Sequence, residues 1–256
     1  MEILWFKVVA IIIIIISGLG GGLLPMRIGV SKLADRLLPL GNAFAGGIFL
    51  GAGLIHLLPD AKENFGRFAG DIDFPLVFLV CGCGFLLVFF LEKVLLRGED
   101  VGAMSGERPV YPFVLTLVLS VHSLIAGAAL GLEKTLTSSV ILFIAIIAHK
   151  SSAAFALGSS LNSAKTPSTR FVMVIIFFSF MTPLGIVLGT AFSSLLTSNT
   201  AAGVEAIFDA LAAGTFLYVS IIDIIEESFT QREERWLKFT LLSASFCFMA
   251  LIAVWM

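Results

Sequence analysis

Long apolar runs alternate with short polar connections along the whole chain of 256 residues. A window of about 19 residues, the length that crosses a bilayer as a helix, is the appropriate ruler for such runs. It predicts eight membrane-spanning helices, near residues 3–24, 40–58, 74–96, 111–131, 138–161, 170–196, 203–226 and 236–255. The short connections leave room for a single membrane domain over residues 1–256 and for no soluble domain. The pattern therefore predicts an all-α polytopic membrane protein.

Composition supports this class and excludes others. Hydrophobic residues make up 58% of the chain and charged residues 13%, whereas a soluble domain carries about 25% charged residues. The lipid bilayer is thus the expected partner, and the net charge of −2 gives no reason to expect nucleic acid. The three cysteines lie inside apolar runs, which favours packing over disulfide or metal chemistry. The first run lacks a strong basic start and a clear cleavage site, so we interpret it as a retained span and not as a signal peptide.

The loop charges predict an orientation, because cytoplasmic loops carry an excess of Lys and Arg. In the eight-span arrangement one side receives only Lys7, Lys62, Arg67 and Lys134. The other side receives a larger basic set: Arg27, Lys32, Arg36, Lys93, Arg97, Arg108, Lys165, Arg170, Arg232, Arg235 and Lys238. We expect the second side to be cytoplasmic, with both termini outside.

Two of the three histidines, His122 and His149, lie near the middle of consecutive spans. Ionisable groups inside a membrane are costly and usually mark a site or a pathway. Two antiparallel neighbours joined by a short turn bring residues of equal depth together, so the two imidazoles are expected to meet. Neutral imidazole binds zinc, iron, nickel and copper ions. Two ligands are too few for structural zinc, which takes four, and an incomplete shell suits an ion that must also leave. The alternative is that each histidine makes a hydrogen bond between helices.

Other polar residues extend this site into a possible route. Lys150 follows His149, and we expect it to face the interior, paired or in a wet cavity, unless it snorkels to the surface. His56 and Asp60, at the outer end of the second span, are expected to form an external mouth. Asp223 near the inner end of the seventh span is expected to collect a departing ion, while the neighbouring Glu226 and Glu227 suit ordinary solvated charges at a helix end.

Small residues and one proline shape the predicted bundle. Glycines recur at four-residue spacing, which lets helix backbones approach closely in lipid: the pairs are Gly47 and Gly51, Gly127 and Gly131, and Gly185 and Gly189. Pro183 lies near the centre of the sixth span, where it frees a backbone carbonyl from its helical bond. The result is either a kink or an exposed oxygen ligand.

Five motifs in order make the chain resemble the ZIP family of divalent metal transporters over nearly its whole length. They are residues 45–49 through 56–60, residues 122–127, His149-Lys150, residues 181–185 and residues 214–218. The resemblance implies a bundle of eight helices with inverted-repeat (3+2+3) character and a homodimer. It also implies uptake of a divalent metal, most often zinc, otherwise iron, manganese or cadmium, into the cytoplasm. The metal is then a transported substrate, and no cofactor is expected.

The family's site residues carry over unevenly. His122 and His149 match its primary transport site, but the carboxylates that many members place four residues later are replaced by Ala126 and Ala153. Some members have a second metal position, and here its places are taken by Ser123, Lys150 and Thr182. In this the chain resembles a subgroup in which the ammonium group of a lysine replaces the second ion. With less negative charge, the site should bind a hard ion such as manganese less well.

Three functions remain to be separated. The leading hypothesis is metal uptake through one central site, by a protein that is not an enzyme. The compact form of the chain, without appended domains, suggests a bacterial inner membrane. An intramembrane metalloenzyme would need a third strong ligand and a general base, and no HExxH motif is present. A membrane protein that binds metal without transporting it is the third. The loop from Arg97 to Arg108 lacks a histidine-rich stretch, so no metal sensor is expected there.

Overall fold

The computed structural model describes residues 2–29, 32–70, 73–95, 111–193, 198–230 and 233–254. Within these residues the eight predicted spans are confirmed as long apolar helical stretches, running over Glu2–Ile28, Asp35–Ala69, Leu76–Leu95, Pro112–Leu132, Leu136–Ser163, Ser168–Phe192, Thr200–Thr230 and Arg235–Ala253. A helix satisfies all of its backbone hydrogen bonds internally, which is the condition for crossing lipid. The loop between Arg97 and Arg108 lies outside the described residues.

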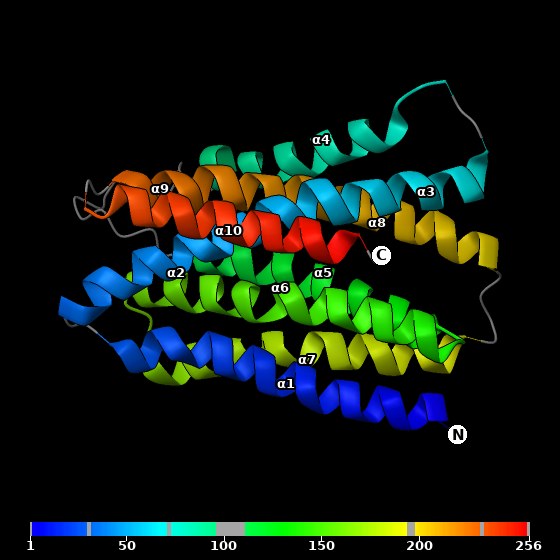
Figure 1. Ribbon diagram of the computed structural model, residues 1–256, viewed down its shortest axis with the longest axis horizontal. Helices are drawn as coiled ribbons and strands as arrows, with labels where there is room; N and C mark the ends of the chain where they lie inside the picture. The colour runs from blue at the N-terminus through cyan, green and yellow to red at the C-terminus, as the bar shows by residue number, and fades with distance from the viewer. Residues whose placement is uncertain are drawn as a thin grey trace.

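Three of the spans contain a π-helical segment (η). In chain order the elements are α1 (Glu2–Ile28), α2 (Lys32–Gly51), η1 (Ala52–Leu57), α3 (Leu58–Ala69), α4 (Leu76–Phe89), η2 (Phe90–Leu95), α5 (Tyr111–Leu132), α6 (Leu136–Ser163), α7 (Ser168–Phe192), α8 (Ser198–Tyr218), η3 (Val219–Ile225), α9 (Glu226–Thr230) and α10 (Arg235–Ala253). The helices run side by side along one long axis, and both termini lie at the same end of the bundle (Figure 1). An even number of spans requires this.

The second span is longer than the sequence predicts. We expected it to end near residue 58, but α3 continues it to Ala69. Pro59 does not interrupt the helix because it stands in the first turn after η1, where a missing N–H is tolerated. The continuation carries Asp60, Glu63 and Arg67 on a helix and leaves His56 well inside the span.

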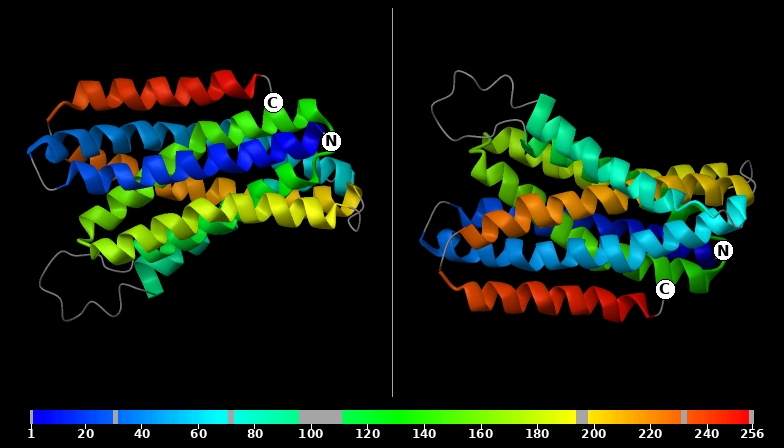
Figure 2. Two further views of the ribbon diagram at one scale, coloured as in Figure 1. Left: turned by 90° about the horizontal axis from the view of Figure 1, so that it is seen from below. Right: turned by 90° about the horizontal axis from the view of Figure 1, so that it is seen from above.

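The pairing of helices has the symmetry expected of an inverted repeat. In the described residues α5 packs on α7 as α6 packs on α1, and α4 packs on α8 as α10 packs on α2. Each pair is converted into its counterpart when span one is exchanged with span six, two with seven, three with eight, and four with five. Figure 2 shows the same bundle from two further sides, with α10 at one edge and α4 at another. The 3+2+3 arrangement implied by the family resemblance is therefore visible in the packing.

Glycine pairs let the backbones of α5 and α7 approach closely. A Cβ on Gly127 would collide with the Thr182 carbonyl oxygen, and one on Gly185 would collide with that of Leu124. The predicted small-residue spacing thus joins α5 to α7 along both helices. In lipid the hydrophobic effect does not drive helices together, so their association depends on dispersion attraction, which close backbone contact increases. Pro183 lies inside α7, which remains helical to Phe192.

Spans two and seven cross at the centre of the molecule. The rings of Phe49 and Phe216, both fully buried, meet edge to face with centroids 4.8 Å apart. Beside them Ser220 Oγ donates a hydrogen bond of 2.8 Å to the Gly46 carbonyl. This crossing places η1 and η3 on either side of an aromatic contact, and it positions the site described below.

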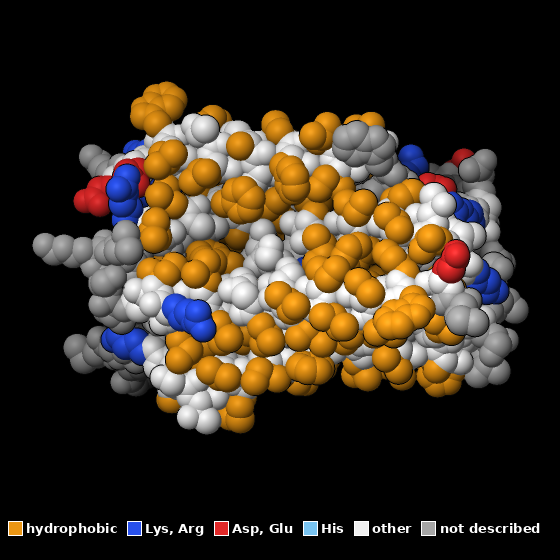
Figure 3. Space-filling model, turned by 60° about the horizontal axis from the view of Figure 1, so that its bottom comes forward, with side chains coloured by type: hydrophobic (Ala, Val, Ile, Leu, Met, Phe, Trp, Pro, Cys, Tyr) orange, Lys and Arg blue, Asp and Glu red, His pale blue; other side chains and the backbone are white. Residues whose placement is uncertain are grey.

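The surface matches a bilayer. Hydrophobic side chains cover the broad middle of the face in Figure 3, while Lys, Arg, Asp and Glu gather mostly toward its two ends. Large apolar side chains of several helices point outward, among them Leu79, Leu117, Phe177 and Val187, which are 50–60% exposed. Such a belt would be unstable in water but is normal against acyl chains.

Candidate functional site

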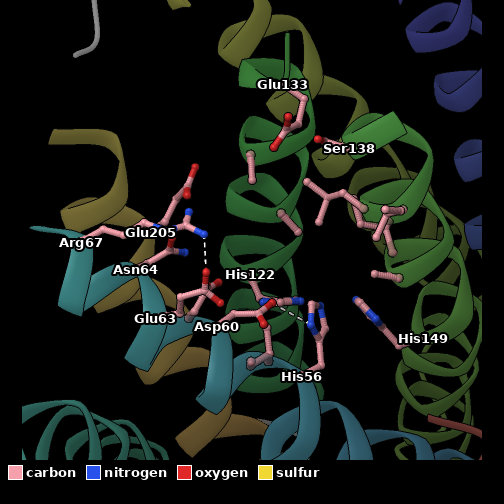
Figure 4. A pocket seen from close by; sticks show the side chains of 18 residues that line it. His56, Asp60, Glu63, Asn64, Arg67, His122, Glu133, Ser138, His149 and Glu205 are labelled. Carbon is pink, nitrogen blue, oxygen red and sulfur yellow. Dashed lines mark hydrogen bonds and ion pairs between the residues drawn. The ribbon is translucent and has the colours of Figure 1, made fainter. Parts of the chain in front are cut away.

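A cavity of about 370 Å³ opens between spans two, four, five and seven. Its deep part contains the imidazoles of His56, His122 and His149, and its outer part contains acidic side chains (Figure 4). The four spans turn their apolar side chains outward and these imidazoles and carboxylates inward. The ionisable groups are thereby kept away from lipid, as intramembrane ionisable residues require. All three histidines of the chain thus lie in one cavity.

His122 on α5 and His149 on α6 face each other, as their matched depth predicts. Their ring centroids are 5.6 Å apart with the planes inclined by 49°, and the residues are 6% and 4% exposed. His122 Nε2 has no hydrogen-bond partner among the described residues. In that part of the chain the alternative, a hydrogen bond from this nitrogen to a neighbouring helix, is therefore not realised. Phe216 closes the site from one side, with its centroid 4.6 Å from that of His122.

His56 lies deeper than we expected. Its ring centroid is 6.3 Å from that of His149. Its side chain is 8% exposed, against 39% for Asp60, whose Oδ2 lies 2.8 Å from His56 Nδ1. The expected external mouth is thus divided, with Asp60 on the cavity wall and His56 beside the central pair. The reason is the extra length of the second span, which moves its outer end to Ala69.

Lys150 is buried, with 2% of its surface exposed, and does not snorkel. Its Nζ donates to Ser123 Oγ at 3.1 Å, to the Phe178 carbonyl at 3.2 Å and to Thr182 Oγ1 at 3.2 Å. Three acceptors satisfy the three donors of an ammonium. None of these acceptors is a carboxylate, because α7 supplies one carbonyl and one hydroxyl group and α5 supplies the other hydroxyl group. Ser123, Lys150 and Thr182 therefore form one connected group behind the histidines.

Asp223 lies in η3 of the seventh span and is 4% exposed. It does not line the cavity that holds the histidines. Glu226, at the start of α9, is exposed, as expected for a solvated charge at a helix end, whereas the side chain of Glu227 is not described. Asp223 thus belongs to a different level of the bundle from the three imidazoles.

Several cavity residues were missed by sequence reasoning. The outer part is lined by Glu63, Asn64, Arg67, Glu133, Glu205 and Asp209. Glu205 and Asp209 are one helical turn apart within an apolar span, and this spacing, which puts two acids on one face, is the signal in the sequence that indicates them. Carboxylates of spans two and seven and of the turn after span four converge here because these spans cross at the cavity. Their excess over Arg67 makes the outer cavity attractive to cations.

The donor set of this cavity suits weak, open metal coordination and not a closed site. Among the described residues no three His, Cys, Asp or Glu side chains stand close enough to hold one ion together. Ala126, one turn after His122, adds only a methyl group to the cavity lining. Closed structural zinc sites need four ligands. A pair of imidazoles with water would bind a borderline ion and still release it.

The fold and site define a polytopic membrane protein of the transporter class, with an inverted-repeat bundle around an imidazole-lined cavity. The chain belongs to the ZIP zinc transporter family, whose model matches residues 4–99 and 97–254. It is 28% identical to "Zinc transporter ZIP2" of Mus musculus and 29% identical to that of Homo sapiens, with 99% of each chain covered in both comparisons. It is 30% identical to "Zinc transporter ZIP1" of Danio rerio, with 97% of each chain covered.

Proposed function

We propose that this protein carries zinc across the membrane into the cytoplasm and binds it between His122 and His149 on the way. The observation that carries the proposal is the approach of these two rings, 5.6 Å between centroids, in a cavity lined with carboxylates on its outer side. Two neutral imidazoles suit zinc, and the missing carboxylates at Ala126 and Ala153 disfavour harder ions. Relatives named as zinc transporters support the choice of metal.

The loop charges give the orientation of the protein in the membrane, and the membrane potential then gives the direction of transport. Within the described residues, the end of the bundle opposite the termini carries most of the Lys and Arg residues, which favours a cytoplasmic position for it. In this orientation the cavity opens to the outside, together with both termini. A membrane potential that is negative inside contributes about 2.3 kcal/mol per charge per 100 mV, so roughly 4.6 kcal/mol for a divalent ion. Inward movement then needs no other energy source if free zinc in the cytoplasm is kept low.

The remaining residues have graded roles in this proposal. Carboxylates of the outer cavity, with Asp60, attract the ion, and the buried Asp223 receives it on the cytoplasmic side. Lys150, held by Ser123 and Thr182, supplies the fixed positive charge that limits the site to a single ion. A homodimer is the assembly that the family resemblance suggests.

Zinc flux into proteoliposomes tests the proposal. His122→Ala and His149→Ala should each lower the initial rate at least tenfold. Val121→Ala and Ile144→Ala are matched controls, because these side chains belong to the same two helices, are 43% and 47% exposed and should face lipid. Both controls should transport at the wild-type rate. Purified protein that binds zinc but never moves it would refute transport, and unchanged rates in both histidine variants would refute the site.

A further inference from the structure

His149 has an imidazole neighbour on each of two sides. The centroid of its ring lies 5.6 Å from that of His122 on α5 and 6.3 Å from that of His56 on η1. All three residues are at most 6% exposed, and all three line the same cavity. The arrangement contains two pairs of imidazoles that share one member.

Both pairs have the span that one zinc ion can bridge. With Zn–N bonds of about 2.0–2.1 Å, two imidazoles on a tetrahedral ion have centroids about 5 Å apart, and the separation cannot exceed about 6.5 Å. The pair of His122 and His149 is close to the tetrahedral value. The pair of His56 and His149 lies near the upper limit, so a bound ion would draw the rings together by about 1 Å.

Asp60 prepares His56 for such a bond. Its Oδ2 lies 2.8 Å from Nδ1 of His56, on the outer side of the imidazole (Figure 4). A carboxylate behind a metal-binding imidazole fixes its orientation and raises its basicity. Asp60 is the more exposed of the two, so the carboxylate stands on the side from which an ion would arrive.

We propose that zinc passes through two overlapping stations, first between His56 and His149 and then between His149 and His122. Asp60 acts as the positioning residue of the first station. Because no three described His, Cys, Asp or Glu side chains can hold one ion together, the ion exchanges His56 for His122 while it stays bound to His149. Water completes the coordination shell at each station. Because the ion keeps one imidazole and its water ligands during the exchange, it is never fully dehydrated and never held by the four protein ligands of a tight structural site. His56 is then a zinc ligand and not only a residue of the outer mouth.

This inference rests on the proposed zinc transport but can fail separately from it. Zinc-loaded protein in detergent is examined by X-ray absorption at the zinc edge, which counts imidazole ligands. Wild type should show two imidazoles. His122→Ala should still show two, because His56 and His149 remain, while its uptake is lost. The double variant His56→Ala with His122→Ala should show at most one.

Uptake kinetics provide the second measurement. His56→Gln, which keeps the side-chain volume, should raise KM about tenfold while zinc still binds between His122 and His149. Asp60→Ala should raise KM about tenfold with little change in kcat, in line with typical losses of carboxylates behind metal ligands. Leu54→Ala is the matched control, because this side chain of η1 is 42% exposed and does not line the cavity.

Two results would overturn the two-station proposal and leave the site at His122 and His149 intact. One is a His122→Ala protein with fewer than two imidazoles on zinc. The other is a His56→Gln protein with wild-type KM. Absence of zinc flux in the wild type would instead refute the proposed transport itself.

Discussion

Replacement of Lys150 by Met gives the sharpest test of how the site is held. Methionine keeps the length and much of the volume of the lysine side chain but removes its three donors. Those donors reach Ser123, the Phe178 carbonyl and Thr182, and Nζ also lies 3.7 Å from the centroid of the Phe178 ring. The variant therefore removes a link between α6, α5 and α7 without leaving a large cavity.

The size of the effect follows from two opposing terms. Hydrogen bonds to a charged group contribute about 1.5–3 kcal/mol each, so three contribute roughly 4.5–9 kcal/mol. Placing a lysine near the centre of a membrane helix costs about 3 kcal/mol. We expect Lys150→Met to lower the free energy of unfolding by about 1.5–6 kcal/mol, since the variant recovers the insertion cost but leaves a buried carbonyl and two hydroxyl groups without their donor.

Unfolding of purified protein in mixed micelles, followed by circular dichroism, measures this change. Lys134→Met is the control, because Lys134 is exposed and its loss should change the free energy by less than about 0.5 kcal/mol. Thr182→Val should cost about 1 kcal/mol in the wild type and almost nothing in the Lys150→Met protein, since the shared bond is already gone. If Lys150→Met unfolds like the wild type, or if the two changes are additive, the ammonium does not hold these helices together.

Three further predictions concern affinity, packing and capture. Ala126→Glu adds a carboxylate one turn after His122 inside the cavity, so it should lower KM for zinc about tenfold and admit manganese in competition uptake; an unchanged ion preference would show that this position does not reach the ion. Gly127→Val should destabilise the bundle by more than 2 kcal/mol because it separates α5 from α7, whereas Gly82→Ala, with open space around it, should be neutral; equal thermal stability of the two variants would contradict the packing argument. Asp209→Asn should raise KM about threefold, most strongly at low ionic strength, and Glu2→Gln should not; a KM shift that does not depend on salt would exclude an electrostatic role.

The sequence by itself determined the class of the protein and the depth of its central pair. Apolar runs of bilayer length have one stable form in lipid, so eight spans could be read directly from hydropathy. His122 and His149 could be matched because two neighbouring antiparallel helices joined by a short turn have almost no freedom in their relative depth. The glycine pairs of α5 and α7 could be recognised for a similar reason, since spacing alone puts them on one face.

Only the tertiary structure decided which distant residues join that pair. His56 reaches His149 because the second span continues to Ala69 and crosses the seventh beside Phe49 and Phe216. Lys150 finds its acceptors on α5 and α7, and Glu205 meets the outer cavity from the seventh span. Hydropathy fixes where a residue lies along the membrane normal, but rotation about each helix axis and the crossing angles decide which side chains face one another. Those are set by the packing of all eight helices together, and no local pattern in the chain contains them.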